Sequence, residues 1–200
     1  MVQAVEISPV GQPTIEIVSL FPKQGEWTEA DYFRLPETNR IIELSEGRLI
    51  ISPSPTEQHQ ETVANIFFML RNYLLKHNIG KALTAPMDTK LKKGIVRQPD
   101  IIFMSNEHLH RNTNKHWGIP DLAIEVTSHG TKREDRKDKY NEYEKAGIKE
   151  YWIVDPDKQA IEVFTLENKV YKIFGKWGSG EIAKSKLLDG FEVSVDEIMA

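Results

Sequence analysis

Two carboxylates and one lysine stand out in this sequence because of their types and positions: Asp100, Glu125 and Lys139. Asp100 opens an apolar segment over residues 101–104, and Glu125 lies near the end of the next apolar segment. In an antiparallel pair the start of one strand lies beside the end of the next, so the two carboxylates are expected to meet at one end of a sheet. Two carboxylates, together with water and phosphate oxygens, suit Mg²⁺ or Mn²⁺. The pattern therefore indicates a metal site with Asp100 and Glu125 as ligands.

Both acids also have structural explanations. Asp100 follows a proline at a strand start, where a turn or capping residue is common. Glu125 lies in a strand that looks buried on both faces, and a buried carboxylate needs a charged partner or a metal. That partner could be an arginine or a lysine, but the same strand contains neither. The metal is therefore the favoured explanation for Glu125.

The charged segment over residues 131–147 reads as a helix in which Asp135, Lys139 and Tyr143 share one face, because they are spaced four residues apart. Tyr140 and Tyr143 are expected to pack inward, which leaves Lys139 at the margin of the buried face. Its ammonium could reach the carboxylates and position water or stabilise charge on a phosphate. The alternative is a solvated lysine in a charged helix. Asp135 is expected to be a surface or first-turn residue.

The elements that must position these residues follow from periodicity and turn signals. The strongest helix begins near Ser54, Thr56 and Glu57 and stops at Gly80, with an apolar stripe of Val63, Ile66, Phe67, Leu70, Leu74 and Leu75. The other expected elements are a short helix within residues 27–39 capped by Thr28, a hairpin over 40–52, strands over 82–91, 96–104, 121–128 and 150–156, and a hairpin over 160–167 and 170–176.

The central order is therefore helix, three strands, helix and strand. Three strands can form an antiparallel meander, and the second helix can cross over to place the fourth strand. The expected fold class is α/β, with a mixed sheet flanked by helices. Residues 1–26 are expected to form an extended arm and residues 27–200 one domain, which suits a chain of 200 residues.

Composition excludes several classes of protein. The chain has no cysteine, so disulfides, thiolate metal sites and thiol nucleophiles are excluded. No apolar run approaches the roughly 20 residues that span a bilayer, and the N-terminus lacks the features of a secretory signal. No membrane association and a cytoplasmic location are therefore expected. The formal net charge of −4 argues mildly against a general DNA-coating protein.

A family resemblance is carried by an ordered set of motifs. The motifs are Gln98-Pro99-Asp100, residues 120–126, Lys139 with Tyr143, residues 147–155 and, upstream, Glu43, Gly47, Pro53 and His59. Over roughly residues 27–165 the chain resembles the Uma-type restriction endonuclease family of the PD-(D/E)XK nuclease superfamily. In one respect it departs from the superfamily, whose lysine would stand at Thr127. The resemblance implies that Lys139, on the following helix, takes this role.

The resemblance implies a restriction endonuclease-like αβββαβ core with N-terminal and C-terminal β additions. It implies a Mg²⁺- or Mn²⁺-dependent endonuclease that acts on nucleic acid, with DNA as the favoured substrate. It also implies a homodimer. Asp100 and Glu125 would be metal ligands and Lys139 catalytic, with His59 and Glu43 as further site residues. His59 could instead cap or pack a helix, and Glu43 could pair with Arg40 or Arg48.

Other functions remain open from the sequence. The chain could be a non-catalytic nucleic-acid-binding or interaction module on the same fold, or a hydrolase of another phosphate substrate. Two clusters of basic residues could line a phosphate path or be solvated: Lys90, Lys92, Lys93 and Arg97, and Lys132, Arg133, Arg136 and Lys137. A loop with His108, His110 and His116 only loosely resembles a zinc site, and a surface loop is favoured.

Overall fold

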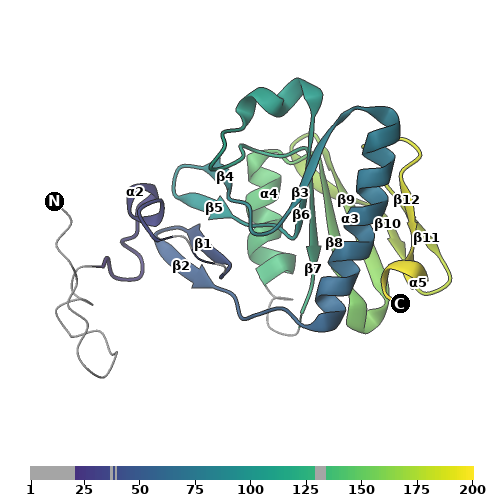
Figure 1. Cartoon of the computed structure of the whole chain (residues 1–200), viewed down its shortest axis with the longest axis horizontal. Coiled ribbons are helices and arrows are strands. Elements are labelled where there is room, and N and C mark those ends of the chain that lie inside the picture. The colour runs from purple at the N-terminus through teal and green to yellow at the C-terminus, as the bar shows by residue number, and fades with distance from the viewer. Residues whose placement is uncertain (1–20, 37, 39, 129–133) are drawn as a thin grey trace.

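The computed structural model describes residues 21–36, 38, 40–128 and 134–200. Its centre is a six-stranded sheet with the strand order β10-β9-β8-β7-β6-β3 (Figure 1). The strands are β3 (Gly80–Thr84), β6 (Ile101–Ser105), β7 (Leu122–Val126), β8 (Glu150–Asp155), β9 (Ala160–Glu167) and β10 (Val170–Trp177). The helix α3 (Glu57–His77) covers one face of this sheet, and α4 (Tyr140–Ala146) covers the other.

Smaller elements lie around this core. A second sheet has the order β2-β1-β5-β4 and consists of β1 (Ile42–Ser45), β2 (Arg48–Ile51), β4 (Thr89–Lys92) and β5 (Ile95–Arg97). The remaining elements are α2 (Glu29–Tyr32), β11 (Ile182–Lys184), β12 (Glu192–Ser194), α5 (Val195–Ile198), two 3-10 helices, η1 (Asn106–Arg111) and η3 (Pro156–Lys158), and a π-helix, η2 (Glu134–Lys139).

The connectivity of the core is the expected one. The strands β3, β6 and β7 form an antiparallel meander, and β8 then lies parallel to β7 after the crossover through η2 and α4. This is the predicted order of helix, three strands, helix and strand. The predicted α/β class, with β additions at both ends of the core, is confirmed.

The strands predicted over residues 82–91 and 96–104 are each divided in two, so this part of the prediction is wrong. The first is interrupted at the Ala85–Pro86 peptide and the second at Pro99. Proline has no backbone N–H to donate to a strand ladder, so pairing ends there. The strands β3 and β6 belong to the large sheet, whereas β4 and β5 belong to the small one. Asp100 therefore lies where the chain passes from one sheet to the other.

Both faces of the strand β7 are buried. Successive side chains of a strand point to opposite faces, so its residues divide between two cores. Leu122, Ile124 and Val126 pack into the core beneath α3. Ala123 packs into the core beneath α4. Glu125 shares the face of Ala123 and therefore faces α4.

The long helix begins as predicted, because the Thr56 side chain accepts a hydrogen bond from the backbone N–H of His59. Its end differs from the prediction. Asn78 takes the left-handed conformation that ends the helix, and Gly80 is the first residue of β3. The apolar stripe is confirmed except at Leu75, which is 71% exposed. None of the helices within the described residues is long and apolar enough to cross a bilayer.

The N-terminal part of the domain is held by backbone contacts to the first hairpin. The predicted hairpin over residues 40–52 is confirmed, and its turn lies at Glu46 and Gly47, which both have a positive φ. The Gly25 N–H donates to the Gly47 carbonyl (2.7 Å), and a Cβ on Gly47 would come within 2.4 Å of the Gly25 oxygen. Thr28 caps α2 as predicted. The predicted arm over residues 1–26 lies largely outside the described residues.

Candidate active site

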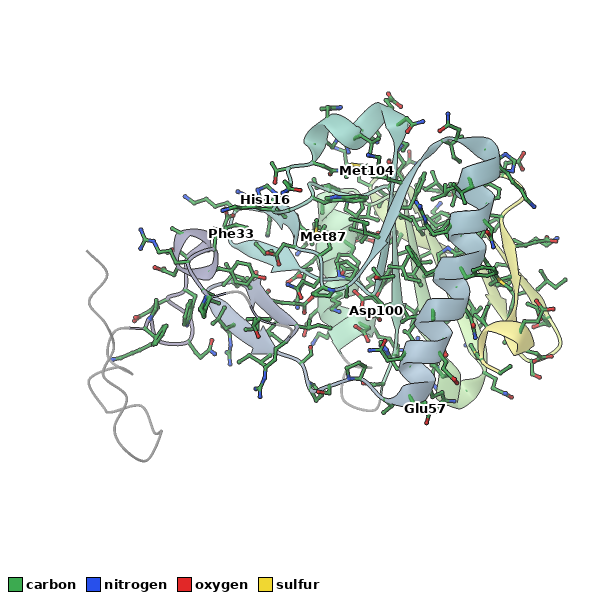
Figure 2. All side chains as sticks on the ribbon, in the orientation of Figure 1. Phe33, Glu57, Met87, Asp100, Met104 and His116 are labelled. Atoms are coloured by element: carbon green, nitrogen blue, oxygen red, sulfur yellow. The ribbon has the colours of Figure 1, made fainter. Side chains whose placement is uncertain are left out.

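The structure brings Asp100 and Glu125 together. The ladder between β6 and β7 pairs Ile101 with Ile124, so the next pair in that direction is Asp100 and Glu125. The backbone N–H of Val126 donates to Asp100 Oδ2 (2.8 Å). Both carboxylates line one cavity of about 250 Å³, and Asp100 lies beside the first turns of α3 (Figure 2).

Glu125 is 2% exposed and is held by two side chains from the crossover segment. The Tyr143 hydroxyl donates to Oε1 (2.6 Å), and Lys139 Nζ lies 2.9 Å from Oε2. Burial raises the pKa of Glu125 well above its ordinary value; Lys139 opposes this effect, and the negative charges of Asp100 and Asp135 add to it. The alternative in which a buried Glu125 pairs with a basic side chain is therefore also supported, because Lys139 of the next element is that partner.

Lys139 is only 7% exposed, so it is not a solvated lysine. Its Nζ lies 3.4 Å from Asp135 Oδ1 and 3.8 Å from Glu43 Oε1, in addition to the contact with Glu125. Burial by itself would lower the pKa of Lys139, but the charges of Glu125, Glu43 and Asp135 hold the pKa well above its ordinary value. Lys139 is therefore a permanent cation and cannot act as a proton acceptor near neutral pH.

Asp135 lies in the first turn of its helix, as one of the two predicted alternatives has it, but it is buried in the candidate site, so the surface alternative is wrong. It is 1% exposed. It is the second residue of the π-helix η2. Such helices are rare, and many of those known lie at functional sites. Its backbone carbonyl accepts a hydrogen bond from Tyr151 (3.0 Å). The four-residue spacing from Asp135 to Lys139 was the signal that could have identified it.

His59 joins the same group of side chains from the first turn of α3. Its Nε2 lies 3.3 Å from Asp100 Oδ2. Burial alone would lower the pKa of His59, but the hydrogen bond and the charge of Asp100 raise it above the ordinary value. His59 Nδ1 is buried and has no hydrogen-bond partner in the part of the chain that the structure describes. This nitrogen needs water or a ligand to satisfy it.

Glu43 reaches the site from the small sheet and is 1% exposed. It pairs with Arg97 (Oε2 to Nη1, 3.0 Å), so the alternative in which Glu43 pairs with Arg40 or Arg48 is replaced by a different arginine. Its Oε1 accepts the backbone N–H of Gln98 (2.7 Å). Burial by itself would raise the pKa of Glu43, but the positive charges of Lys139 and Arg97 lower it.

Arg97 is enclosed rather than part of a basic surface, which corrects its predicted place in a phosphate path. It is 1% exposed and also contacts Glu142 of α4 (Nε to Oε2, 2.6 Å). The Ser45 hydroxyl donates to the other oxygen of Glu142 (2.6 Å). These contacts join the small sheet to α4, the helix that continues directly from Lys139.

The other residues of the predicted phosphate path divide into paired and exposed ones. Lys90 pairs with Glu29 (2.5 Å), and Arg136 pairs with Glu162. Lys132 and Arg133 lie outside the described residues. The exposed members are Lys92, Lys93 and Lys137, together with the paired Arg136.

The three histidines of the predicted loop have separate partners. His108 Nδ1 lies 2.8 Å from the buried carboxylate of Asp121. His110 Nδ1 contacts the Glu107 carbonyl (2.9 Å), and the His116 ring lies against Phe33, with the ring centres 5.5 Å apart. The favoured prediction of a loop is wrong over Asn106–Arg111, where η1 gives the segment regular structure.

Asp121 is a further buried carboxylate, away from the candidate active site. Burial by itself would raise its pKa, but hydrogen bonds from Lys149, the Ser105 backbone and His108 outweigh this effect and lower the pKa to about 2. Lys149 Nζ lies 2.8 Å from Oδ1. Asp121 is therefore ionised in the folded protein and fastens η1 to the sheet.

Comparisons with known proteins can be set beside this geometry. A family model described as "Uma2: Putative restriction endonuclease" matches residues 29–196. A similar solved structure is that of a putative nuclease belonging to DUF820 from Anabaena variabilis, with 19% sequence identity and a TM-score of 0.72. The match covers 86% of this chain and 97% of that chain. The comparison with curated proteins gave no match.

Proposed function

Because the chain belongs to the Uma2 family, we propose that it is a metal-dependent endonuclease that hydrolyses phosphodiester bonds in DNA. One observation carries the proposal: the Lys139 ammonium lies on the wall of the same cavity as Asp100 and Glu125. Two carboxylates suit a divalent ion, and a fixed ammonium beside them suits the charge that develops on a phosphate during hydrolysis.

The side chains of this cavity fit a divalent cation in their chemistry and charge. Three carboxylates and one cation line the cavity, and a divalent ion would offset the excess of negative charge. These four residues are Asp100, Glu125, Asp135 and Lys139. Asp100 Oδ2 is taken by Val126 and His59, whereas Oδ1 has no hydrogen-bond partner among the described residues.

Asp100 and Glu125 would hold Mg²⁺ or Mn²⁺, with water and phosphate oxygens completing the coordination. Mg²⁺ is usually bound through one or two carboxylates rather than by an all-protein cage. Within residues 21–36, 38, 40–128 and 134–200, no three His, Cys, Asp or Glu residues are grouped to hold a metal by themselves. When bound, the ion supplies positive charge beside the scissile phosphate.

Lys139 supplies a second fixed positive charge. Its Nζ donates a hydrogen bond to a phosphate oxygen or to the attacking water, and it cannot remove a proton because its pKa is raised. Contacts with Glu125 and Asp135 fix the ammonium before substrate arrives, so little reorganisation is needed during the reaction. Tyr143 orients Glu125, and His59 orients Asp100.

A cleavage assay on supercoiled plasmid and on single-stranded DNA tests this function. We expect cleavage with Mg²⁺ or Mn²⁺, none with EDTA, and a loss of about a hundredfold or more for Glu125→Gln. Glu192→Gln, an exposed glutamate on β12, is the matched control and should cut like the wild type. Cleavage that survives EDTA, or equal cleavage by both variants, would contradict the proposal.

We also propose that the protein acts as a homodimer. Support comes from β10, an edge strand of the large sheet that exposes Val170 (54%), Ile173 (56%) and Phe174 (42%). Apolar side chains gathered on an edge are typical of an interaction surface, and most soluble oligomers are twofold dimers.

A further inference from the structure

A second cavity, of about 570 Å³, lies next to the candidate active site. The two cavities share Asp100, His59, Ile41 and the segment 52–55. Glu125 and Lys139 line only the smaller cavity. Asp100 therefore stands on the boundary between the candidate reaction centre and the larger space beside the first turns of α3 (Figure 2).

The walls of the larger cavity combine apolar surfaces with a few polar groups. Val63 and Phe67 of α3 and Pro86 of the turn after β3 contribute apolar surface, whereas Arg40 and Gln60 contribute polar groups. Sites for small organic ligands typically have this volume and this composition. A nucleobase suits such walls, because it has apolar faces for stacking and a polar edge for hydrogen bonds.

Building on the proposed nuclease function, we propose that this cavity receives an unstacked nucleobase next to the scissile phosphate. A phosphate bound at Asp100 would place the neighbouring nucleoside at the boundary that the two cavities share. His59, whose buried Nδ1 has no hydrogen-bond partner among the described residues, lines both cavities at this boundary. A base within a duplex is stacked and paired and cannot enter. The substrate class is therefore single-stranded or locally unpaired nucleic acid.

The distribution of charge favours an unpaired strand over a duplex. Binding to duplex DNA relies on lysine and arginine contacts to phosphates, but the chain has a net charge of −4. Two cations near the site are enclosed by carboxylates, Arg97 by Glu43 and Glu142, and Lys139 by Glu125. Stacking on apolar and aromatic side chains gives affinity for single strands without a strongly basic surface.

Filling the cavity tests the inference. Ala64 is an exposed residue of α3 on the cavity wall, so Ala64→Trp places an indole in the cavity without disturbing the core. Asn72→Trp, an exposed position further along α3 and outside the cavity, is the matched control. Fluorescence anisotropy without divalent ions would give the Kd of each variant for a labelled single-stranded oligonucleotide and for its duplex. Cleavage of both would be measured with Mn²⁺.

We expect the wild type to bind and cut the single strand in preference to the duplex. Ala64→Trp should weaken single-strand binding about tenfold, the loss of roughly one base-stacking contact, and Asn72→Trp should match the wild type. An oligonucleotide carrying 4-thiothymidine should photocrosslink in the wild type to the peptide that contains Phe67.

The outcomes separate this inference from the proposed function. If the wild type cuts duplex and single strand equally and Ala64→Trp behaves like the wild type, the nuclease function stands and the base-binding cavity is refuted. If single-strand binding is selective and sensitive to Ala64→Trp but no strand is cut, the cavity stands and the nuclease function fails. Crosslinks found only in peptides outside the cavity also refute it.

Discussion

Replacing Arg97 by methionine tests whether a buried charge network joins the small sheet to α4. Arg97 donates to Glu43 Oε2 from Nη1 (3.0 Å) and to the two oxygens of Glu142 from Nε (2.6 Å) and Nη2 (3.1 Å). Methionine keeps an unbranched apolar stem but removes the charge and these hydrogen bonds. The variant therefore leaves two carboxylates without their shared cation.

The loss in free energy of unfolding comes mainly from Glu43. The Glu142 side chain is 14% exposed and also accepts a hydrogen bond from Ser45, so it can turn to water. Glu43 is 1% exposed and would keep, among the described residues, the Gln98 N–H and the Lys139 ammonium 3.8 Å away. Removing one partner of a buried ion pair costs about 3–5 kcal/mol. Because two partners remain, we expect a loss near the lower end, about 3 kcal/mol.

Urea denaturation at pH 7, followed by tryptophan fluorescence, gives the free energy of unfolding for each variant. Adding Glu43→Gln to Arg97→Met should restore much of the loss, because the amide is uncharged and can still accept from the Gln98 N–H. A loss below about 1 kcal/mol for Arg97→Met would refute the network. A double variant whose loss equals the sum of the single losses would show that the two residues are not coupled.

Single substitutions elsewhere test the lysine, the ionised Asp121 and the sheet edge. Lys139→Ala should lower single-turnover cleavage about a hundredfold or more, while metal and DNA affinity persist. If Lys139→Ala and the exposed control Lys137→Ala instead both weaken DNA binding mildly and equally, then Lys139 is not the residue that stabilises charge on the phosphate. The pKa of Asp121, about 2, lies below its ordinary 3.8, so its ionised form stabilises the fold above about pH 4 and this contribution disappears as the pH falls toward 2. Asp121→Asn should therefore lose about 1–2 kcal/mol at pH 7, after allowance for solvent screening, and little near pH 2, as measured by urea denaturation. Ile173→Arg should convert a dimer to a monomer in light scattering, and a wild type that is monomeric at high concentration would refute the dimer.

The order of the core elements was predictable because its signals are local. The apolar run around Glu125, the stripe of α3 and the hairpin turn at Gly47 each depend on residues close together in the chain. The proximity of Asp100 and Glu125 follows from one rule: in an antiparallel pair, the start of one strand lies beside the end of the other. Such signals identify the helices and strands and their neighbours, so the αβββαβ arrangement of the core could be predicted from their order along the chain.

The partners of the buried charges were not predictable, because they come from distant segments. Glu43 and Arg97 belong to strands of the small sheet that are far apart in sequence, and β4 and β5 are separate strands of that sheet because two prolines divide the longer predicted strands. The sequence-based view kept Arg97 in a long strand next to a basic turn and gave it a surface role. No local pattern distinguishes an arginine that meets a phosphate from one that two glutamates enclose.

The lysine on the helix has a geometric explanation in the strand beside it. In the superfamily motif the lysine would stand at Thr127, two residues after Glu125, and side chains two residues apart in a strand share a face. Glu125 faces α4, and η2 lies directly before α4 in the crossover. Lys139 therefore approaches the carboxylate from the face that a strand lysine would also use, and Thr127 is left buried at 3% exposure. If Lys139 is the active-site lysine, as we propose, then the lysine has moved to another element while its ammonium still reaches the carboxylate on the same face of the sheet.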